Sequence, residues 1–124
     1  MLGNCDIIAF VTTSDGERAR KFYEGTLGLR VVQDSPFALE IDANGTMLRI
    51  AKADKVNVAP YTVLGWKVPD IQKSVRELAA KGVNFERYPR MPQDDLGIWA
   101  SPGGARVAWF KDPDGNTLSL TQFP

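Results

Sequence analysis

The chain contains the same pattern of predicted elements twice, and this internal repeat limits the fold more than any other feature of the sequence. The first copy covers residues 6–52 and the second covers residues 61–122. Each copy begins with an apolar strand followed by a helix, and each ends with a hairpin whose turn contains a glycine, Gly45 or Gly115. A repeat of this length that occurs only twice is typical of a duplicated supersecondary unit, because solenoids need at least three copies.

The first copy has the pattern of one strand, one helix and three further strands. Residues 6–13 are apolar and β-branched, as in a mostly buried strand. Ser14 and Glu17 have the spacing of a capping box, so we expect the helix to begin at Ser14. Gly28 is expected to end this helix with a positive φ. The three strands that follow are predicted at residues 29–34, 36–42 and 46–52.

The second copy follows a predicted linker at residues 53–60 and repeats this order. Pro69 disfavours a helical conformation before it and Asp70 is a good N-cap, so we expect a helix from there to Gly82. The strands are predicted at residues 61–68, 83–88, 97–101, 105–111 and 116–122. This copy is longer because of an insertion within residues 87–104. Such insertions often carry function, and the alternative is a plain connector.

Composition excludes several classes of function. The formal net charge is zero, so there is no electrostatic argument for binding nucleic acid or an anionic membrane. No apolar run approaches the roughly 18 residues of a membrane-spanning helix. Cys5 is the only cysteine, which excludes an intrachain disulfide and suits the cytoplasm, where we expect the protein. Histidine is absent, so no nucleophilic triad with a serine or with Cys5 is available.

Two βαβββ units of this size resemble the vicinal oxygen chelate superfamily, which includes glyoxalase I, the extradiol dioxygenases and the bleomycin resistance proteins. The resemblance implies an α+β fold in which residues 1–124 form one domain. Each unit would be a curved mixed sheet that forms a cup, with its helix outside. A homodimer is also implied, because two chains complete the sites of many members. The most specific parts of the resemblance are Phe22-Tyr23 with Leu27-Gly28-Leu29, and the turn Asp112-Pro113-Asp114-Gly115-Asn116.

Enzymes of this superfamily hold a divalent metal with His, Glu or Gln at four sheet positions, one in the first and one in the last strand of each unit. The equivalent positions here carry Ile8, Arg49, Val63 and Ser119. Isoleucine and valine have no donor atoms, arginine stays charged, and serine is a poor ligand for Zn, Ni or Fe. The resemblance therefore implies a member without a metal or another cofactor, in which the cup binds a small molecule.

Strand side chains alternate between the two faces of a sheet, so these four positions indicate which other residues face the cup. The predicted ligand-binding residues on these strands are Ile8, Phe10, Met47, Arg49, Val63, Lys67 and Ser119. The alternate residues, from Ile7 to Leu120, are apolar, as a helix-covered face requires. Arg49 either anchors a carboxylate or phosphate group of the ligand or forms a salt bridge, for which Glu40 is one candidate.

Aromatic residues in and near the insertion are further candidates. Trp99 and Trp109 lie on predicted strands of the second copy and are suited to stacking on a planar ligand. Packing in the core or in a dimer interface is the alternative. Tyr88 and Met91 lie in the insertion, where they are candidates for lining a lid over the pocket.

These observations predict metal-independent binding or sequestration of a small organic molecule, anionic or aromatic, as in the bleomycin resistance proteins. No nucleic acid or membrane partner is expected. The alternative is an enzyme, either a glyoxalase-like lyase or isomerase or a relative of the dioxygenases, although the sequence shows no positioned base. A third possibility is a protein-binding domain, which an exposed apolar patch would favour.

Overall fold

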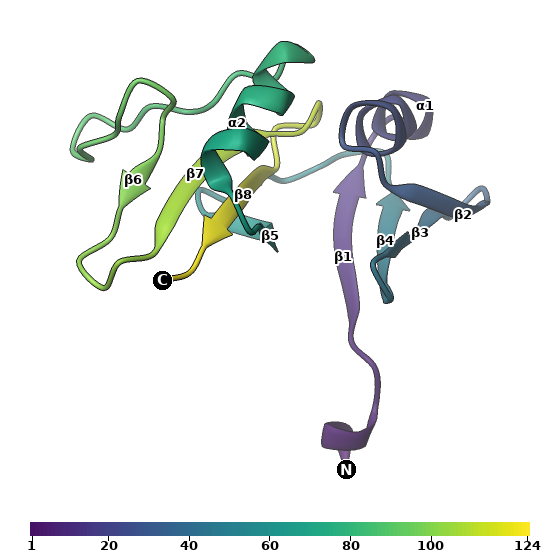
Figure 1. The fold of residues 1–124 in the computed structure, drawn as a ribbon. Coiled ribbons are helices and arrows are strands. Elements are labelled where there is room, and N and C mark those ends of the chain that lie inside the picture. Colours follow the sequence, from purple (N-terminus) through teal and green to yellow (C-terminus); the bar gives the residue numbers. More distant parts are fainter. The chain divides into compact units, whose positions relative to one another are not determined.

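The computed structural model describes all residues from 1 to 124 and divides into two compact units, residues 1–57 and 58–124. Each unit contains one four-stranded mixed sheet and one helix that follows its first strand (Figure 1). The predicted α+β fold of two βαβββ units is therefore confirmed. Neither α-helix is long and apolar enough to cross a membrane.

In the first unit, the sheet has the strand order β1-β4-β3-β2. Strand β1 is parallel to β4, and the other neighbours are antiparallel. Helix α1 contacts β3 and β4, and a short 3-10 turn precedes β1 (Figure 1). The elements are η1 (Leu2–Asn4), β1 (Ile8–Thr13), α1 (Gly16–Arg20), the π-helical continuation η2 (Lys21–Thr26), β2 (Arg30–Asp34), β3 (Ala38–Ala43) and β4 (Thr46–Lys52).

In the second unit, the sheet has the equivalent order β5-β8-β7-β6. Strand β5 is parallel to β8, and helix α2 contacts β7 and β8 (Figure 1). Ile71 and Val75, which lie one turn apart, are the buried residues of α2. The elements are β5 (Thr62–Lys67), α2 (Ile71–Ala80), β6 (Trp99–Ala100), β7 (Arg106–Lys111) and β8 (Thr117–Gln122).

The two α-helices begin in the same way, and this corrects one prediction. Asp15, not Ser14, is the N-cap of α1, and its carboxylate accepts a hydrogen bond from the backbone N–H of Arg18 at 3.1 Å. The helix starts one residue later than expected because Asp15 has the extended backbone that an N-cap needs. Asp70 caps α2 as predicted and accepts from the backbone N–H of Lys73 at 3.1 Å.

The predicted turns before the last strands are present. Asn44 and Gly45 have φ values of 52° and 93°, the left-handed conformation that a tight hairpin requires. In the second unit, the buried carboxylate of Asp112 accepts hydrogen bonds from the backbone N–H groups of Asp114 and Asn116 at 3.0 and 2.9 Å. A buried carboxylate with several donors fixes the turn, and through it the register of β7 against β8.

The prediction of a strand at residues 83–88 is wrong. This segment runs beside β7 but makes only an isolated bridge between Phe85 and Phe110, next to a hydrogen bond from the Glu86 N–H to the Trp109 carbonyl. The alternating apolar residues resemble a strand because the segment does lie at the edge of the sheet. It lacks the repeated backbone hydrogen bonds that define one.

The side chain of Gln93 replaces the missing backbone partner of this segment. Its Oε1 accepts a hydrogen bond from the Tyr88 N–H at 2.8 Å, while its Nε2 donates to the carbonyls of Glu86 and Gly97 at 2.9 and 2.8 Å. The Gln93 amide therefore ties the segment at residues 86–88 to Gly97 within the insertion. Backbone contacts of Phe85, Glu86 and Gln93 join this region to β7 and β6, and β6 is reduced to two residues.

The two faces separate by burial in the first unit, whereas on β8 residues of both faces are buried. Leu48, Ile50 and Leu118 are fully buried on the side that the helix covers. Ile7, which was expected on that side, is 76% exposed because it precedes the first residue of β1. The alternate side chains Ile8, Phe10 and Met47 of the first unit are exposed, whereas Thr117 and Ser119 of the second are nearly buried.

Candidate functional site

The predicted site residues of the first unit lie in two adjoining rows across the sheet. Ile8 pairs with Met47, and Phe10 pairs with Arg49, which in turn pairs with Glu40 on β3. Directly opposite residues share a face, so these side chains project on the same side. Phe10 is 60% exposed, and Ile8 and Met47 are also exposed. This face is therefore open and largely apolar.

Arg49 forms an ion pair with Glu40, the salt bridge that the sequence left as one alternative. One Nη of the guanidinium donates to a carboxylate oxygen of Glu40, and both side chains are partly buried. The pair has no net charge. An anchor for an anionic ligand requires an uncompensated positive charge, so this geometry does not favour the anchoring role of Arg49.

The predicted site residues of the second unit share one face with both tryptophans. Ser119 pairs with Gly65 on one side and with Trp109 on the other. In the next row, Thr121 pairs with Lys67 and with Val107, which pairs with Trp99. Cross-strand partners project on the same side of a sheet. Trp99 and Trp109 therefore lie on the face of Ser119, away from the helix.

Val63 departs from its expected equivalence with Ile8. The register of β5 against β8 shifts between Thr62 and Leu64, so Val63 is an extra residue in a bulge. Ile8, by contrast, pairs regularly with Met47. The two residues have the same distance in sequence from their helix N-caps but differ in their strand pairing.

A hollow with aromatic walls lies within the second unit at this face, with a volume of about 260 Å³. Tyr88 and Trp109 were predicted site residues, and Met91 was predicted to lie over the pocket. Tyr61 was missed because it is the first residue of the strand predicted at residues 61–68, where only its aromatic ring next to a proline gave a signal. We name this hollow the aromatic hollow, and its lining residues are Pro60, Tyr61, Thr62, Tyr88, Met91, Trp109 and Thr117.

The rings in and beside the aromatic hollow are held against one another. Tyr88 and Trp109 meet nearly at right angles, with centroids 5.5 Å apart and an interplanar angle of 84°. Trp99 packs on Trp109, with ring centroids 6.0 Å apart, but Trp99 does not line the aromatic hollow. Burial, with a smaller effect from the Glu86 carboxylate, raises the pKa of Tyr88 above its usual value. The Tyr88 phenol therefore stays neutral at physiological pH.

Two buried hydroxyl groups on β8 have no partner in the protein. Thr117 and Ser119 are 6% and 7% exposed, and no hydrogen bond within the chain involves either hydroxyl. Thr117 lines the aromatic hollow. Beside Ser119, Gly65 has no room for a side chain, since a Cβ there would lie only 2.7 Å from the Ser119 Oγ, which packs directly over the glycine. Arg106 Nε is the fully buried side-chain polar atom without a partner, so the oxygens of Thr117 and Ser119 remain accessible and can pair with a ligand group in place of water.

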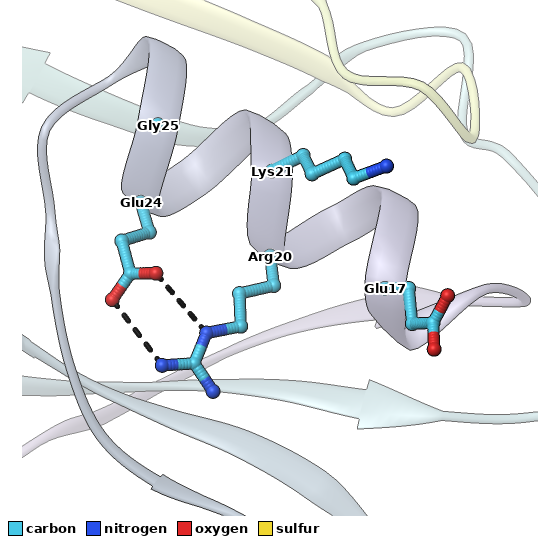
Figure 2. A pocket seen from close by; sticks show the side chains of 5 residues that line it. All are labelled: Glu17, Arg20, Lys21, Glu24 and Gly25. Atoms are coloured by element: carbon cyan, nitrogen blue, oxygen red, sulfur yellow. Dashed lines mark hydrogen bonds and ion pairs between the residues drawn. The ribbon is translucent and has the colours of Figure 1, made fainter.

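A second depression lies on the outer side of α1 and η2 in the first unit (Figure 2). Arg20 and Glu24 face one another across it at 3.1 Å, whereas Glu17 and Lys21 point away from this pair. Arg20 also lies 3.4 Å from Asp34, and the Glu24 and Asp34 carboxylates raise its pKa. These charges compensate one another on an exposed surface, so we regard this depression as a solvated helix face.

Two βαβββ units, each with a helix on one side of its sheet and an open face on the other, define a protein with the vicinal oxygen chelate fold. The chain belongs to the Glyoxalase/Bleomycin resistance protein/Dioxygenase superfamily, whose family model matches residues 6–120. This membership agrees with the resemblance of the motifs.

Three similar proteins illustrate the range of the superfamily. The uncharacterized protein YraH of Bacillus subtilis strain 168 is 29% identical over 122 residues, which cover 86% of this chain and 89% of YraH. A superfamily member from Sphaerobacter thermophilus has a TM-score of 0.72 at 27% identity, covering 94% of this chain and 95% of that one. Lactoylglutathione lyase from Agrobacterium tumefaciens has a TM-score of 0.74 at 15% identity, covering 96% and 93%. The last similarity concerns the fold alone.

The residues at the four metal positions of the superfamily do not fit a divalent metal. Ile8 and Val63 offer no donor atom, and the guanidinium of Arg49 is positively charged and already paired with Glu40. Ser119 alone supplies one neutral hydroxyl, which is a weak ligand. No group of three or more His, Cys, Asp or Glu side chains elsewhere in the chain is arranged to hold a metal ion.

Proposed function

We propose that this protein binds a small organic molecule in the aromatic hollow of its second unit, without a metal, in the manner of the bleomycin resistance proteins. The observation that carries the proposal is the combination of aromatic walls with the unpartnered hydroxyl of Thr117. A concave, mostly apolar site with a few fixed polar groups is typical of small-molecule binding.

The polar groups support an aromatic or apolar ligand group in the hollow in preference to an anionic one. No lysine or arginine lines the aromatic hollow. Arg49, the predicted anion anchor, belongs to the first unit and is neutralised by Glu40. Trp109 and Tyr88 provide ring surfaces, and the hydroxyls of Thr117 and Ser119 are available to orient a polar substituent.

The arrangement favours binding over turnover. The enzymes that share this fold depend on an electrophile, which the residues at the four metal positions do not hold. Glu40, the candidate partner of Arg49, is occupied by its ion pair with that residue. A glyoxalase-like lyase or isomerase, or a dioxygenase relative, remains the alternative function, and the test below separates it from binding.

Tryptophan fluorescence tests the proposal directly. All three tryptophans lie within residues 58–124, so their emission reports on the unit that contains the hollow. We expect saturable changes with planar aromatic compounds such as indole and naphthol, and the same affinity with or without EDTA. Tyr88→Leu should weaken binding at least about 10-fold, the size expected for losing one stacked ring. Phe123→Leu, which changes an exposed aromatic residue outside the hollow, should not.

Binding that EDTA abolishes and a divalent metal restores would contradict the metal-independent function and favour the enzyme alternative. Equal ligand affinities of the Tyr88→Leu and Phe123→Leu variants would show that the ligand binds outside the aromatic hollow.

The homodimer implied by the resemblance stays a prediction, which sedimentation velocity at several protein concentrations tests. Fractionation of the native host tests the predicted cytoplasmic location.

A further inference from the structure

We propose that the aromatic hollow takes the alkylated ammonium group of a small organic cation. This inference rests on the binding function proposed above and names the chemistry of the ligand group inside the hollow. It follows from the angle between the rings, the absence of charged lining residues, and the small volume.

The ring geometry fits a compact group better than a flat one. Tyr88 and Trp109 meet at 84°, so their faces form a corner and not a slot. A planar ligand sandwiched between two rings needs parallel faces, and in this corner it would stack on only one of them. A rounded trimethylammonium group contacts both faces at once, and the ring of Tyr61 and the thioether of Met91 complete the wall around it.

The electrostatics of the aromatic hollow favour a positive charge. The face of an aromatic ring carries negative potential, and a cation within about 6 Å of the ring centroid is attracted to it. None of the seven lining residues is charged, so no lysine or arginine repels a cation there. The Glu86 carboxylate acts on Tyr88 from outside the lining and is paired with Lys111 at 3.6 Å. The attraction therefore comes from the rings themselves.

The size and polar content limit the ligand further. At about 260 Å³ the hollow is smaller than the roughly 300 to 1,000 Å³ of typical drug-sized sites, so it fits one group of a ligand and not a whole large molecule. Thr117 is the buried polar residue of the lining, and its accessible hydroxyl has no partner in the protein. It is suited to a hydrogen bond with a hydroxyl or carbonyl oxygen a few bonds from the ammonium nitrogen.

A pair of probes with the same shape and different charge tests the inference. Choline and 3,3-dimethyl-1-butanol differ in whether the quaternary centre is a charged nitrogen or a neutral carbon. We would titrate both into the full-length protein and follow binding by isothermal calorimetry and tryptophan fluorescence. Choline should bind saturably and at least about 10-fold more tightly, because desolvated cation–π contacts are worth a factor of this size.

Two substitutions at Tyr88 show whether the ring is responsible. Tyr88→Phe keeps the aromatic face and should retain choline binding within about threefold, whereas Tyr88→Leu should lose it. Phe123→Leu is the matched control outside the hollow and should bind as the parent does. Circular dichroism and the unfolding midpoint establish that each variant is folded.

The failures of the two proposals are distinguishable. Equal affinity for choline and its neutral analogue, or retention of choline binding in Tyr88→Leu, overturns the cation inference. If choline does not bind but indole or naphthol binds and is lost in Tyr88→Leu, the cation inference fails and the proposed binding function stands. If no probe of either kind binds, both proposals fail.

Discussion

The side chain of Gln93 holds the insertion in place, and replacing it is the most direct test of how the site is built. Its amide makes three hydrogen bonds, with the Tyr88 N–H and with the carbonyls of Glu86 and Gly97, at 2.8, 2.9 and 2.8 Å. Gln93→Leu keeps a side chain of similar size and removes all three. At a net value of about 1 kcal/mol for each hydrogen bond, the unit should lose about 3 kcal/mol of unfolding free energy.

Urea unfolding followed by tryptophan fluorescence measures this loss in the relevant unit. The three tryptophans lie within residues 58–124, so their emission follows this unit. Gln72→Leu is the matched control, because Gln72 is exposed on α2 and makes no hydrogen bond through its side chain. Its effect should stay within about 0.5 kcal/mol, as is usual for a surface substitution.

Gln93→Glu separates hydrogen bonding from packing. The carboxylate has nearly the same shape and keeps an acceptor for the Tyr88 N–H. Its second oxygen, however, faces the carbonyls of Glu86 and Gly97 where the amide donated. We therefore expect a clear loss of stability at neutral pH despite the conserved shape. If both Gln93 variants unfold at the same urea concentration as Gln72→Leu, the proposed role of this amide is refuted.

Three further outcomes follow from individual contacts. Gly65→Ala places a methyl group 2.7 Å from the Ser119 Oγ and should lower the unfolding free energy by about 1 to 3 kcal/mol. Adding Ser119→Ala to the same chain removes the clashing oxygen and should restore most of this loss, measured by thermal unfolding. The Lys52 ammonium lowers the pKa of Asp34, so their ion pair stabilises the folded state above the ordinary carboxyl pKa, and this stabilisation is lost as the pH falls. Asp34→Asn should flatten the acid dependence of the unfolding free energy, measured by circular dichroism. Burial raises the pKa of Tyr88, so the neutral phenol contributes to the unfolding free energy below the ordinary tyrosine pKa, and this contribution is lost as the pH rises through the higher pKa of the folded state. Tyr88→Phe should flatten the alkaline part of the plot of unfolding free energy against pH.

The fold was predictable because its signals are local in the sequence. The Asn44-Gly45 turn, the Asp70 cap and the Asp112 turn each depend on residues within four positions of one another. The strand at residues 83–88 failed for the opposite reason. Its hydrogen-bond partner is the side chain of Gln93, which lies outside the segment, so no periodicity within residues 83–88 reveals that a side-chain amide takes the place of a strand.

The candidate site was predictable only in part, because alternation indicates a face and not a partner. It placed Ser119 on the face away from the helix, and the register adds Trp109 directly beside it. Whether Arg49 anchors a ligand or pairs with Glu40 depends on the register of β3 against β4, which the sequence left open. Tyr61 was missed because the path of the chain before β5, and not its composition, brings it to the hollow.

The two units of the fold differ in a way that supports the proposed metal-independent binding. Arg49 and Ser119 occupy equivalent positions in the last strands of the two units, but their neighbours differ. Arg49 lies between Phe10 and Glu40, and the ion pair uses its charge within the sheet. Ser119 lies between Gly65 and Trp109, where its hydroxyl packs over the glycine and makes no hydrogen bond within the chain. The polar group of the first unit is thus satisfied internally and that of the second is free for a ligand. We therefore expect Arg49→Met together with Glu40→Leu to leave ligand affinity unchanged, and Ser119→Ala or Thr117→Val to reduce it.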